Sequence, residues 1–309
     1  MSRRPDAEFR PRIKMHEGEI DIDEFLVERL MTAQFPQFAN LPIHAVQSTG
    51  TVNVIYRLGD HFCARFPLLK SWARDIEKEW DWLPKLAPHL SLHIPEPVAK
   101  GQPISEYPFP WAIYRWIEGH PYQDDLIQDE RQAAADLAQF LIELRRVDPV
   151  GAPPTGRKAL RDLDTATRKA METLQSTIDR DAIALAWSNA LEAAAWDGTP
   201  VWIHTDLLRS NLLVKGGRLR AVIDFGGIGV GDPAADVIAA WSVFNSIGRS
   251  VFRAALDVDD DTWNRSRGYA LHQAVLIMPY YAETNPGLVA LAERTIKEVL
   301  TDLGYTTLA

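Results

Sequence analysis

The stretch that decides the fold lies in the second half of the chain, where residues 203–211 read IHTDLLRSN and residues 222–226 read VIDFG. Each piece joins a short run of β-forming residues to polar ones, and a turn with two glycines separates them, as in a β-hairpin. A loop after the first strand can direct Asp206 and Asn211 into one cleft, and the hairpin returns the chain so that Asp224 reaches the same place. The stretch therefore predicts one site with three oxygen-bearing side chains.

Two carboxylates and an amide suit Mg²⁺, which prefers a few protein oxygens completed by phosphate and water. A phosphoryl-transferring enzyme needs the same set: one Asp to orient a hydroxyl, and an Asn and an Asp to hold metal. A hydrolase with His204, Asp206 and Asp224 as ligands of a transition metal is disfavoured, because the flanking segments offer no further His or Cys.

The order of these residues resembles a known pattern. H-x-D-x-x-x-x-N followed by D-F-G is typical of eukaryotic-type protein kinases and of the aminoglycoside phosphotransferase family. The continuation Gly231-Asp232-Pro233-Ala234-Ala235-Asp236 is similar to that of the small-molecule phosphotransferases, and the chain has no Ala-Pro-Glu segment of the protein-kinase type. Over roughly residues 40–300, the chain therefore resembles the aminoglycoside phosphotransferase family.

The resemblance implies an α+β, bilobal protein-kinase-like fold with a small β-rich N-lobe and a larger, mainly helical C-lobe. It implies Asp206 as catalytic base, Asn211 and Asp224 as Mg²⁺ ligands, and ATP or GTP as phosphoryl donor. His204 would brace the loop without carrying a proton.

Two departures from the family pattern stand in the loop. Thr205 occupies a position that is usually Gly, and it adds a β-branched side chain where the backbone can require an unusual conformation. Leu208-Arg209-Ser210 stand where His-Pro-Gly is common; Arg209 would point to solvent or, alternatively, reach a phosphate.

A loop between two predicted strands of the N-terminal part resembles the nucleotide-covering loop of the family, which has one Gly followed by Asn and Tyr-Arg-Leu. Gly50, Asn53 and Tyr56-Arg57-Leu58 match this pattern. An ordinary hairpin turn is the alternative, because the full G-x-G-x-x-G pattern is absent. The residues expected at the phosphates are Ser48, Thr49, Gly50, Thr51 and Asn53.

The resemblance also implies a cation and a hinge strand. Arg65 stands where kinases have a lysine, and its partner on the following helix would be Glu79, with Glu77 as the competitor; a surface ion-pair helix is the alternative. Adenine would meet the carbonyl of Arg115 and the N–H of Ile117. The aromatic residues around that strand are otherwise expected to pack in the core.

Hydrophobic periodicity predicts the remaining elements. A helix has Asp21 or Asp23 near its start, three antiparallel strands occupy residues 43–66, a helix covers 72–87, and a buried strand covers 111–117. Helices are predicted at 130–147, about 160–178, 181–196, 232–247, 261–281 and 286–303. We expect an arm over residues 1–20, an N-lobe over 21–117, and over 118–309 a helical C-lobe with the catalytic loop and the metal-binding hairpin.

Composition restricts the partners. The 309 residues carry a net charge of −9, with −2 in residues 1–120 and −7 in the rest, and no basic run that would bind nucleic acid is present. No apolar stretch is long enough for a membrane span or a signal peptide, and Cys63, expected in the core, is the only cysteine. We expect a cytoplasmic protein without a nucleic-acid or membrane partner; the sequence leaves the oligomeric state open.

The expected reaction is transfer of a γ-phosphoryl group to a hydroxyl of a small molecule, and the acidic second part is compatible with a polycationic aminoglycoside. Other antibiotics and sugar-like alcohols remain open. Asp232 and Asp236 are interpreted as helix-start residues, and Glu283 as a candidate for the substrate pocket. The alternative function is a non-catalytic, nucleotide-binding regulatory protein on the same fold.

Overall fold

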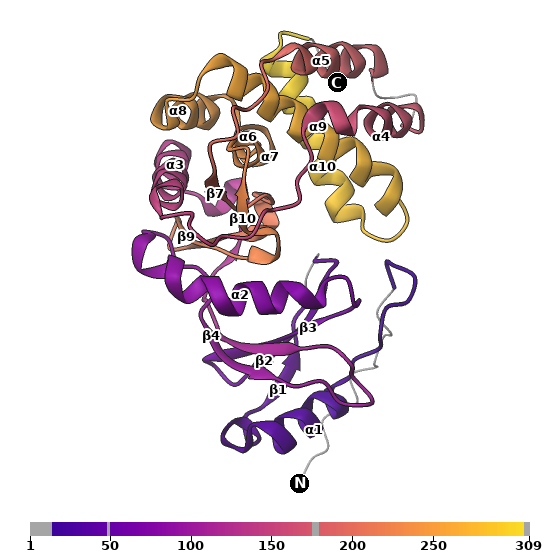
Figure 1. Cartoon of the computed structure of the whole chain (residues 1–309), viewed down its shortest axis with the longest axis vertical. Coiled ribbons are helices and arrows are strands. Elements are labelled where there is room, and N and C mark those ends of the chain that lie inside the picture. Colours follow the sequence, from indigo (N-terminus) through magenta and orange to yellow (C-terminus); the bar gives the residue numbers. More distant parts are fainter. Residues whose placement is uncertain (1–13, 48–49, 175–178, 306–309) are drawn as a thin grey trace.

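The computed structural model describes residues 14–47, 50–174 and 179–305. The chain forms two lobes stacked along the long axis of the molecule, a β-rich one and a mainly helical one (Figure 1). This arrangement confirms the predicted α+β bilobal fold.

The first lobe is built on one five-stranded antiparallel sheet. Its strands are β1 (Ile43–Ala45), β2 (Asn53–Leu58), β3 (Phe62–Pro67), β4 (Pro97–Gly101) and β5 (Trp111–Arg115), in the spatial order β1-β2-β3-β5-β4. β1 pairs with β2 and β2 with β3 in antiparallel register, so the three strands predicted within residues 43–66 are confirmed. Gly59, at φ +57°, supplies the left-handed residue of the β2–β3 turn.

Two helices cover the sheet, one on each side (Figure 1). α1 (Glu24–Gln34) begins at Asp23, whose side chain accepts a hydrogen bond from the Leu26 N–H. α2 (Ala73–Leu86) lies on the side that faces the second lobe. Phe66 and Trp111, both fully buried, stack with ring centroids 5.0 Å apart in the core under α1. Cys63 is buried, as predicted.

The described part of the N-terminal arm links the two lobes. The N–H of Ile20 donates to the carbonyl of Leu68, while His16 Nδ1 lies 2.7 Å from the hydroxyl of Tyr280 in the second lobe. The His16 ring also packs edge-on against Trp72 at 4.8 Å. The arm therefore closes one side of the junction between the lobes.

The second lobe consists of helices around two small sheets. Its helices are α3 (Glu130–Arg146), α4 (Leu160–Glu172), α5 (Arg180–Glu192), α6 (Ala234–Val237), α7 (Ala239–Ser242), α8 (Ser246–Leu256), α9 (Asp260–Tyr281) and α10 (Pro286–Asp302). Its strands are β6 (His120–Pro121), β7 (Val201–Ile203), β8 (Leu212–Lys215), β9 (Arg218–Val222) and β10 (Gly229–Gly231). β6, β8 and β9 form one sheet, and β7 pairs with β10 in the other. The helix predicted at about 160–178 ends at Glu172, and residues 175–178 lie outside the described part.

One predicted helix is wrong. Residues 232–247 form the two short helices α6 and α7, and a third helix starts at Ser246. Asn245 causes the new start, because its side chain accepts hydrogen bonds from the N–H groups of Ile247 and Gly248. The carbonyl of Val243, at the end of α7, accepts from Arg209.

No helix in the described ranges is long and apolar enough to cross a membrane.

Candidate functional site

A cavity of about 340 Å³ lies between the loop before β2 and the polar loop after β7. Its lining residues are Gly50, Thr51, Val52, Arg157, Asp206, Leu208, Ser210, Asn211, Asp224, His272, Gln273, Leu276, Ile277, Tyr281 and Leu288. The three residues singled out by the sequence, Asp206, Asn211 and Asp224, therefore meet at one cavity, although β8 and β9 separate the last two along the chain.

The loop after β7 is held by the buried ring of His204. Its Nε2 lies 3.1 Å from the carbonyl of Ile223, and its Nδ1 accepts the backbone N–H of Asp206 at 3.2 Å. Because Nδ1 accepts, these contacts assign the ring proton to Nε2. His204 thus joins the Asp206 loop to the residue before Asp224, and both ring nitrogens are engaged, which leaves no nitrogen for a transition metal.

Asp206 and Asn211 are joined directly. The Asn211 amide nitrogen donates to the backbone carbonyl of Asp206 at 2.9 Å and to its Oδ2 at 2.8 Å. This orientation turns the amide oxygen Oδ1 of Asn211 away from Asp206.

Gln273 on α9 is a site residue that the sequence reasoning missed. Its Nε2 donates to Oδ1 of Asp206 at 2.7 Å, across 67 residues of sequence. Burial of Asp206, together with the charge of Asp224, raises the pKa of the Asp206 carboxyl above its ordinary value, and the hydrogen bond from Gln273 opposes that rise. The only sequence signal is an amide on a mostly apolar helix, which is not specific.

Asp236 lies in the first turn of α6, as predicted, although this helix is only four residues long. The sequence did not predict its contacts with the loop after β7. The fully buried Asp236 carboxylate accepts the N–H of His204 at 2.8 Å and that of Thr205 at 2.7 Å. Asp236 therefore fixes the backbone just before Asp206.

Thr205 adopts a left-handed conformation, with φ +78°, at the position where the family usually has Gly. A β-branched residue is strained there. The strain is sustained because both peptide groups of Thr205 are held: the N–H by Asp236, and the carbonyl by the Arg157 guanidinium.

Asp224 sits at the start of a 3-10 turn, η5 (Phe225–Gly227), with φ +65°. Its Oδ1 accepts from Arg65 Nη2 at 3.1 Å, which connects the metal-site candidate to β3. Phe225 is fully buried and packs edge-on against His204, at 4.6 Å between ring centroids. This packing anchors the turn that presents Asp224.

Arg65 is the cation of the first lobe. Its Nη1 donates to both carboxylate oxygens of the fully buried Glu79, each at 2.8 Å. Burial alone would lower the pKa of Arg65, but the carboxylates of Glu79 and Asp224 raise it. The sequence did not identify Tyr114, whose hydroxyl also donates to Glu79, at 2.6 Å. The competitor Glu77 is exposed and instead pairs with Lys100 at 2.6 Å.

The remaining nucleotide-site predictions fall in three groups. Ser48 and Thr49 lie outside the described residues. Gly50 and Thr51 line the cavity, but Asn53, which pairs with Pro67 at the start of β2, does not. Arg115 ends β5 with its side chain exposed and paired to Glu96, and Ile117 follows in the connection to the second lobe; neither lines the cavity.

Two further expectations are wrong. Arg209 neither points to solvent nor lines the cavity: it is buried, pairs with Asp124 at 2.6 Å, and donates twice to the Val243 carbonyl. The open end of α7 accounts for this burial, since a guanidinium satisfies a carbonyl that a helix would otherwise pair. Glu283 is exposed after α9 and does not line the cavity.

The donor set fits magnesium. Asn211 and Asp224 offer an amide and a carboxylate oxygen, while the described ranges contain no group of three or more His, Cys, Asp or Glu side chains arranged to hold a metal. Two protein ligands are enough for Mg²⁺ when phosphate and water complete its coordination, whereas a transition metal would need more.

Comparisons with known proteins agree with this geometry. Residues 46–270 match the model of the phosphotransferase enzyme family. The uncharacterized protein YcbJ of Bacillus subtilis (strain 168) is 26% identical over 167 residues, which are 51% of this chain and 52% of that protein. Viomycin phosphotransferase of Streptomyces vinaceus is 27% identical over 199 residues, or 59% of this chain and 67% of that enzyme. The match thus spans about half of the first of these relatives and two thirds of the second.

Among solved structures, the GDP and kanamycin complex of APH(2")-IIia has a TM-score of 0.72 at 20% identity. The match covers 89% of this chain and 98% of that one. This likeness extends over both lobes and shows the kinase-like fold.

Proposed function

The chain belongs to the phosphotransferase enzyme family, and on that premise we propose that it transfers the γ-phosphoryl group of ATP or GTP to a hydroxyl group of a small molecule. The observation that carries the proposal is the convergence of Asp206, Asn211 and Asp224 at one cavity that also receives the loop before β2. Such a site needs a base, metal ligands and a cover for the phosphates. In this proposal Asp206 is the base, Asn211 and Asp224 are the metal ligands, and the loop before β2 is the cover.

Asp206 is the proposed catalytic base. Its two oxygens are fixed by Gln273 and Asn211, so the carboxylate keeps one orientation toward the cavity. The acceptor oxygen forms a bond to the γ-phosphorus, the bond from that phosphorus to the β–γ bridging oxygen breaks, and the nucleoside diphosphate leaves. The hydroxyl proton moves to Asp206, whose raised pKa favours its uptake.

Asn211 and Asp224 are the proposed Mg²⁺ ligands. When bound, magnesium neutralises charge on the phosphate oxygens. Arg65 donates to Asp224, and this contact keeps the carboxylate beneath the phosphate-covering loop. The buried Glu79 holds Arg65 in turn, so the two lobes meet through a chain of ion pairs.

The two lobes have different proposed roles. Residues 21–117 would cover the nucleotide, with Ser48, Thr49, Gly50, Thr51 and Asn53 at the phosphates and the Arg115 and Ile117 backbone at adenine. Residues 118–309 would supply the catalytic loop and the metal ligands, and the predicted arm over residues 1–20 would precede them. We place the reaction in the cytoplasm, where magnesium nucleotides are available.

The test is a screen for phosphoryl transfer. The protein is incubated with Mg²⁺, ATP or GTP, and pooled hydroxyl compounds, among them kanamycin and viomycin, and products are followed by mass. We expect at least one compound to gain one phosphoryl group, with equal release of nucleoside diphosphate, and Asp224→Ala to abolish both.

Calorimetry with and without EDTA supplies the second readout. We expect magnesium-dependent nucleotide binding in the wild type and none in Asp224→Ala. If the wild type binds nucleotide tightly but phosphorylates nothing, the chain is the non-catalytic nucleotide-binding protein of the alternative reading.

A further inference from the structure

The wall of the cavity that faces the acceptor carries little charge. Beyond the reaction centre, it is formed by Leu208 and by residues of α9 and α10, with Arg157 beside them. His272 on this wall is neutral at physiological pH, because burial lowers its pKa to about 4, and its Nδ1 lies 2.7 Å from the hydroxyl of Thr167. Arg157 is therefore the charged side chain that this wall offers to an acceptor.

The Arg157 guanidinium has capacity for a ligand. One nitrogen donates to the Thr205 carbonyl, and the group lies 5.7 Å from the centre of the Tyr269 ring. In residues 14–47, 50–174 and 179–305, no carboxylate forms an ion pair with Arg157, whereas Arg65, Arg209 and Arg265 each have a carboxylate partner. An unpaired guanidinium at a cavity is a binding group for a carboxylate or phosphate.

Apart from Asp206 and Asp224 at the reaction centre, four acidic residues of the second lobe have partners away from the cavity wall. Asp232 pairs with Arg265 at 2.9 Å, and Asp236 lies buried under the catalytic loop. Asp259 caps α9, and Asp261 accepts the N–H of Ala194. The charge of −7 in residues 121–309 thus does not extend to the acceptor wall.

Among the described residues of the first lobe, none adds a carboxylate to this wall. Glu19, whose charge acts on Tyr281, is buried and accepts the N–H groups of Met15 and His16. Away from the carboxylates of Asp206 and Asp224 at the reaction centre, a polycation would meet Arg157 and mostly apolar side chains. An ammonium group buried on that part of the wall would lack a partner.

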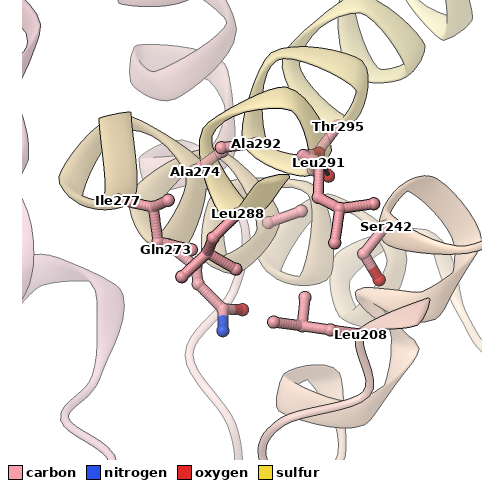
Figure 2. A pocket seen from close by; sticks show the side chains of 10 residues that line it. Leu208, Ser242, Gln273, Ala274, Ile277, Leu288, Leu291, Ala292 and Thr295 are labelled. Atoms are coloured by element: carbon pink, nitrogen blue, oxygen red, sulfur yellow. Dashed lines mark hydrogen bonds between the residues drawn. The ribbon is translucent and has the colours of Figure 1, made fainter. Parts of the chain in front are cut away.

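Besides the polar Thr51, Ser210 and Gln273, the rest of the wall is mainly apolar. Leu276, Ile277, Tyr281 and Leu288 stand on it, and Leu208 faces them from the catalytic loop. Figure 2 shows the small pocket behind this wall, where Leu288 and Leu291 of α10 point toward Leu208. Its volume of about 10 Å³ admits nothing larger than a methyl group, so hydrocarbon of the acceptor would lie mainly against the wall itself.

From this charge pattern we propose that the acceptor is a hydroxyl compound with an anionic group, a carboxylate or a phosphate, joined to an apolar segment. Arg157 binds the anion, the apolar side chains of the cavity wall pack against the hydrocarbon, and the hydroxyl reaches Asp206. The inference rests on the proposed function, and it opposes the polycationic acceptor that bulk charge suggested.

A structural role for Arg157 is the competing explanation, because it also holds the strained Thr205. The two roles differ in one respect. If Arg157 only holds Thr205, its loss should weaken the binding of all acceptors alike. If it binds an anion, its loss should weaken the binding of negatively charged acceptors only.

The experiment compares acceptors of equal length and different charge. Unbranched ω-hydroxycarboxylates, amino alcohols and diols of butyl to octyl length, ω-hydroxyalkyl phosphates, and kanamycin are titrated into the protein with Mg²⁺ and a non-hydrolysable ATP analogue. Phosphoryl transfer to each is measured separately. We expect an anionic probe, carboxylate or phosphate, to bind about ten- to a hundredfold more tightly than its amine.

Variants at two neighbouring arginines complete the design. Arg157→Gln should remove the preference for anions, Arg157→Lys should keep part of it, and Arg161→Gln, at an exposed position of α4, should keep it in full. Three results overturn the inference: tighter binding of amines or kanamycin, equal weakening of all probes by Arg157→Gln, or no binding of any anionic probe. Charge-selective binding without phosphoryl transfer would instead refute the proposed function alone.

Discussion

Replacing Asp236 by Asn tests how the catalytic loop is held. The carboxylate accepts two backbone N–H groups at 2.7 and 2.8 Å in a fully buried position. An amide of the same shape keeps one acceptor and turns an NH₂ group toward the other N–H. Losing one hydrogen bond to a charged acceptor, with a buried donor left unpaired, costs about 2–4 kcal/mol. The charge of Asp236 also favours the buried Arg145 guanidinium, so the loss acts on both groups.

Thermal unfolding measures the loss of stability in Asp236→Asn. At about 2–4 °C per kcal/mol, Asp236→Asn should lower Tm by about 5–15 °C. Asp181→Asn, an exposed change of the same chemistry in the first turn of α5, should leave Tm within about 1–2 °C.

Steady-state kinetics measure the effect of Asp236→Asn on catalysis. The catalytic loop is displaced while Arg65 and Asp224 keep their contacts, so kcat should fall about ten- to a hundredfold with little change in KM for the nucleotide. A Tm and kcat equal to those of Asp181→Asn would refute the bracing role of Asp236.

Three further changes probe the surrounding structure. Thr205→Gly removes a β-branched side chain at φ +78° and should stabilise the protein by about 1 kcal/mol in urea unfolding; a loss of stability would contradict the strain. The pKa of His272 is lowered to about 4 in the folded protein, so as pH falls from about 6.5 to 4 the unfolded state binds the proton first and the folded state loses stability. Thermal unfolding at a series of pH values should show that His272→Gln removes about 2 kcal/mol of this loss. An unchanged pH profile would contradict the lowered pKa. Arg209→Ala breaks the pair with Asp124 and should cost about 3 kcal/mol while leaving the nucleotide Kd unchanged, and a weaker Kd in calorimetry would restore the phosphate role.

The sequence predicted the parts of the fold that depend on local signals. Alternating β-formers separated by turn residues predicted β1 to β3. Of the two candidates for the start of α1, Asp21 and Asp23, the structure has Asp23 as the cap. The fixed spacing of Asp206, Asn211 and Asp224 was enough to expect them at one cavity, because a hairpin constrains where its ends return.

Other features depend on tertiary contacts that no local pattern encodes. Asp236 had the spacing of a helix-start anion, yet its partners lie 31 and 32 residues away. Arginine side chains usually lie at the surface, and nothing near Arg209 in the sequence indicates otherwise. In the structure Arg209 is buried because the Val243 carbonyl at the end of α7 accepts a hydrogen bond from it. The helical pattern predicted over residues 232–247 continued across the break because residues 234–244 are buried on every face, so periodicity did not mark the new helix start at Asn245.

Net charge was the weakest guide to the chemistry of the acceptor. The acidic balance of the second lobe suggested a cationic acceptor, whereas ion pairs and caps engage carboxylates such as Asp232 and Asp259 away from the cavity, which keeps Asp206 and Asp224. Net charge describes solubility and long-range attraction, and the side chains of the wall determine which molecule binds.

The central claim is that Asp206 accepts the hydroxyl proton beside the nucleotide held with Asn211 and Asp224. The most direct measurement is single-turnover phosphoryl transfer by Asp206→Asn, with the acceptor found in the screen, together with the Kd for Mg·ATP. We expect transfer to be slower by about a thousandfold and the Kd to stay within about twofold of the wild type. Transfer at the wild-type rate would contradict it.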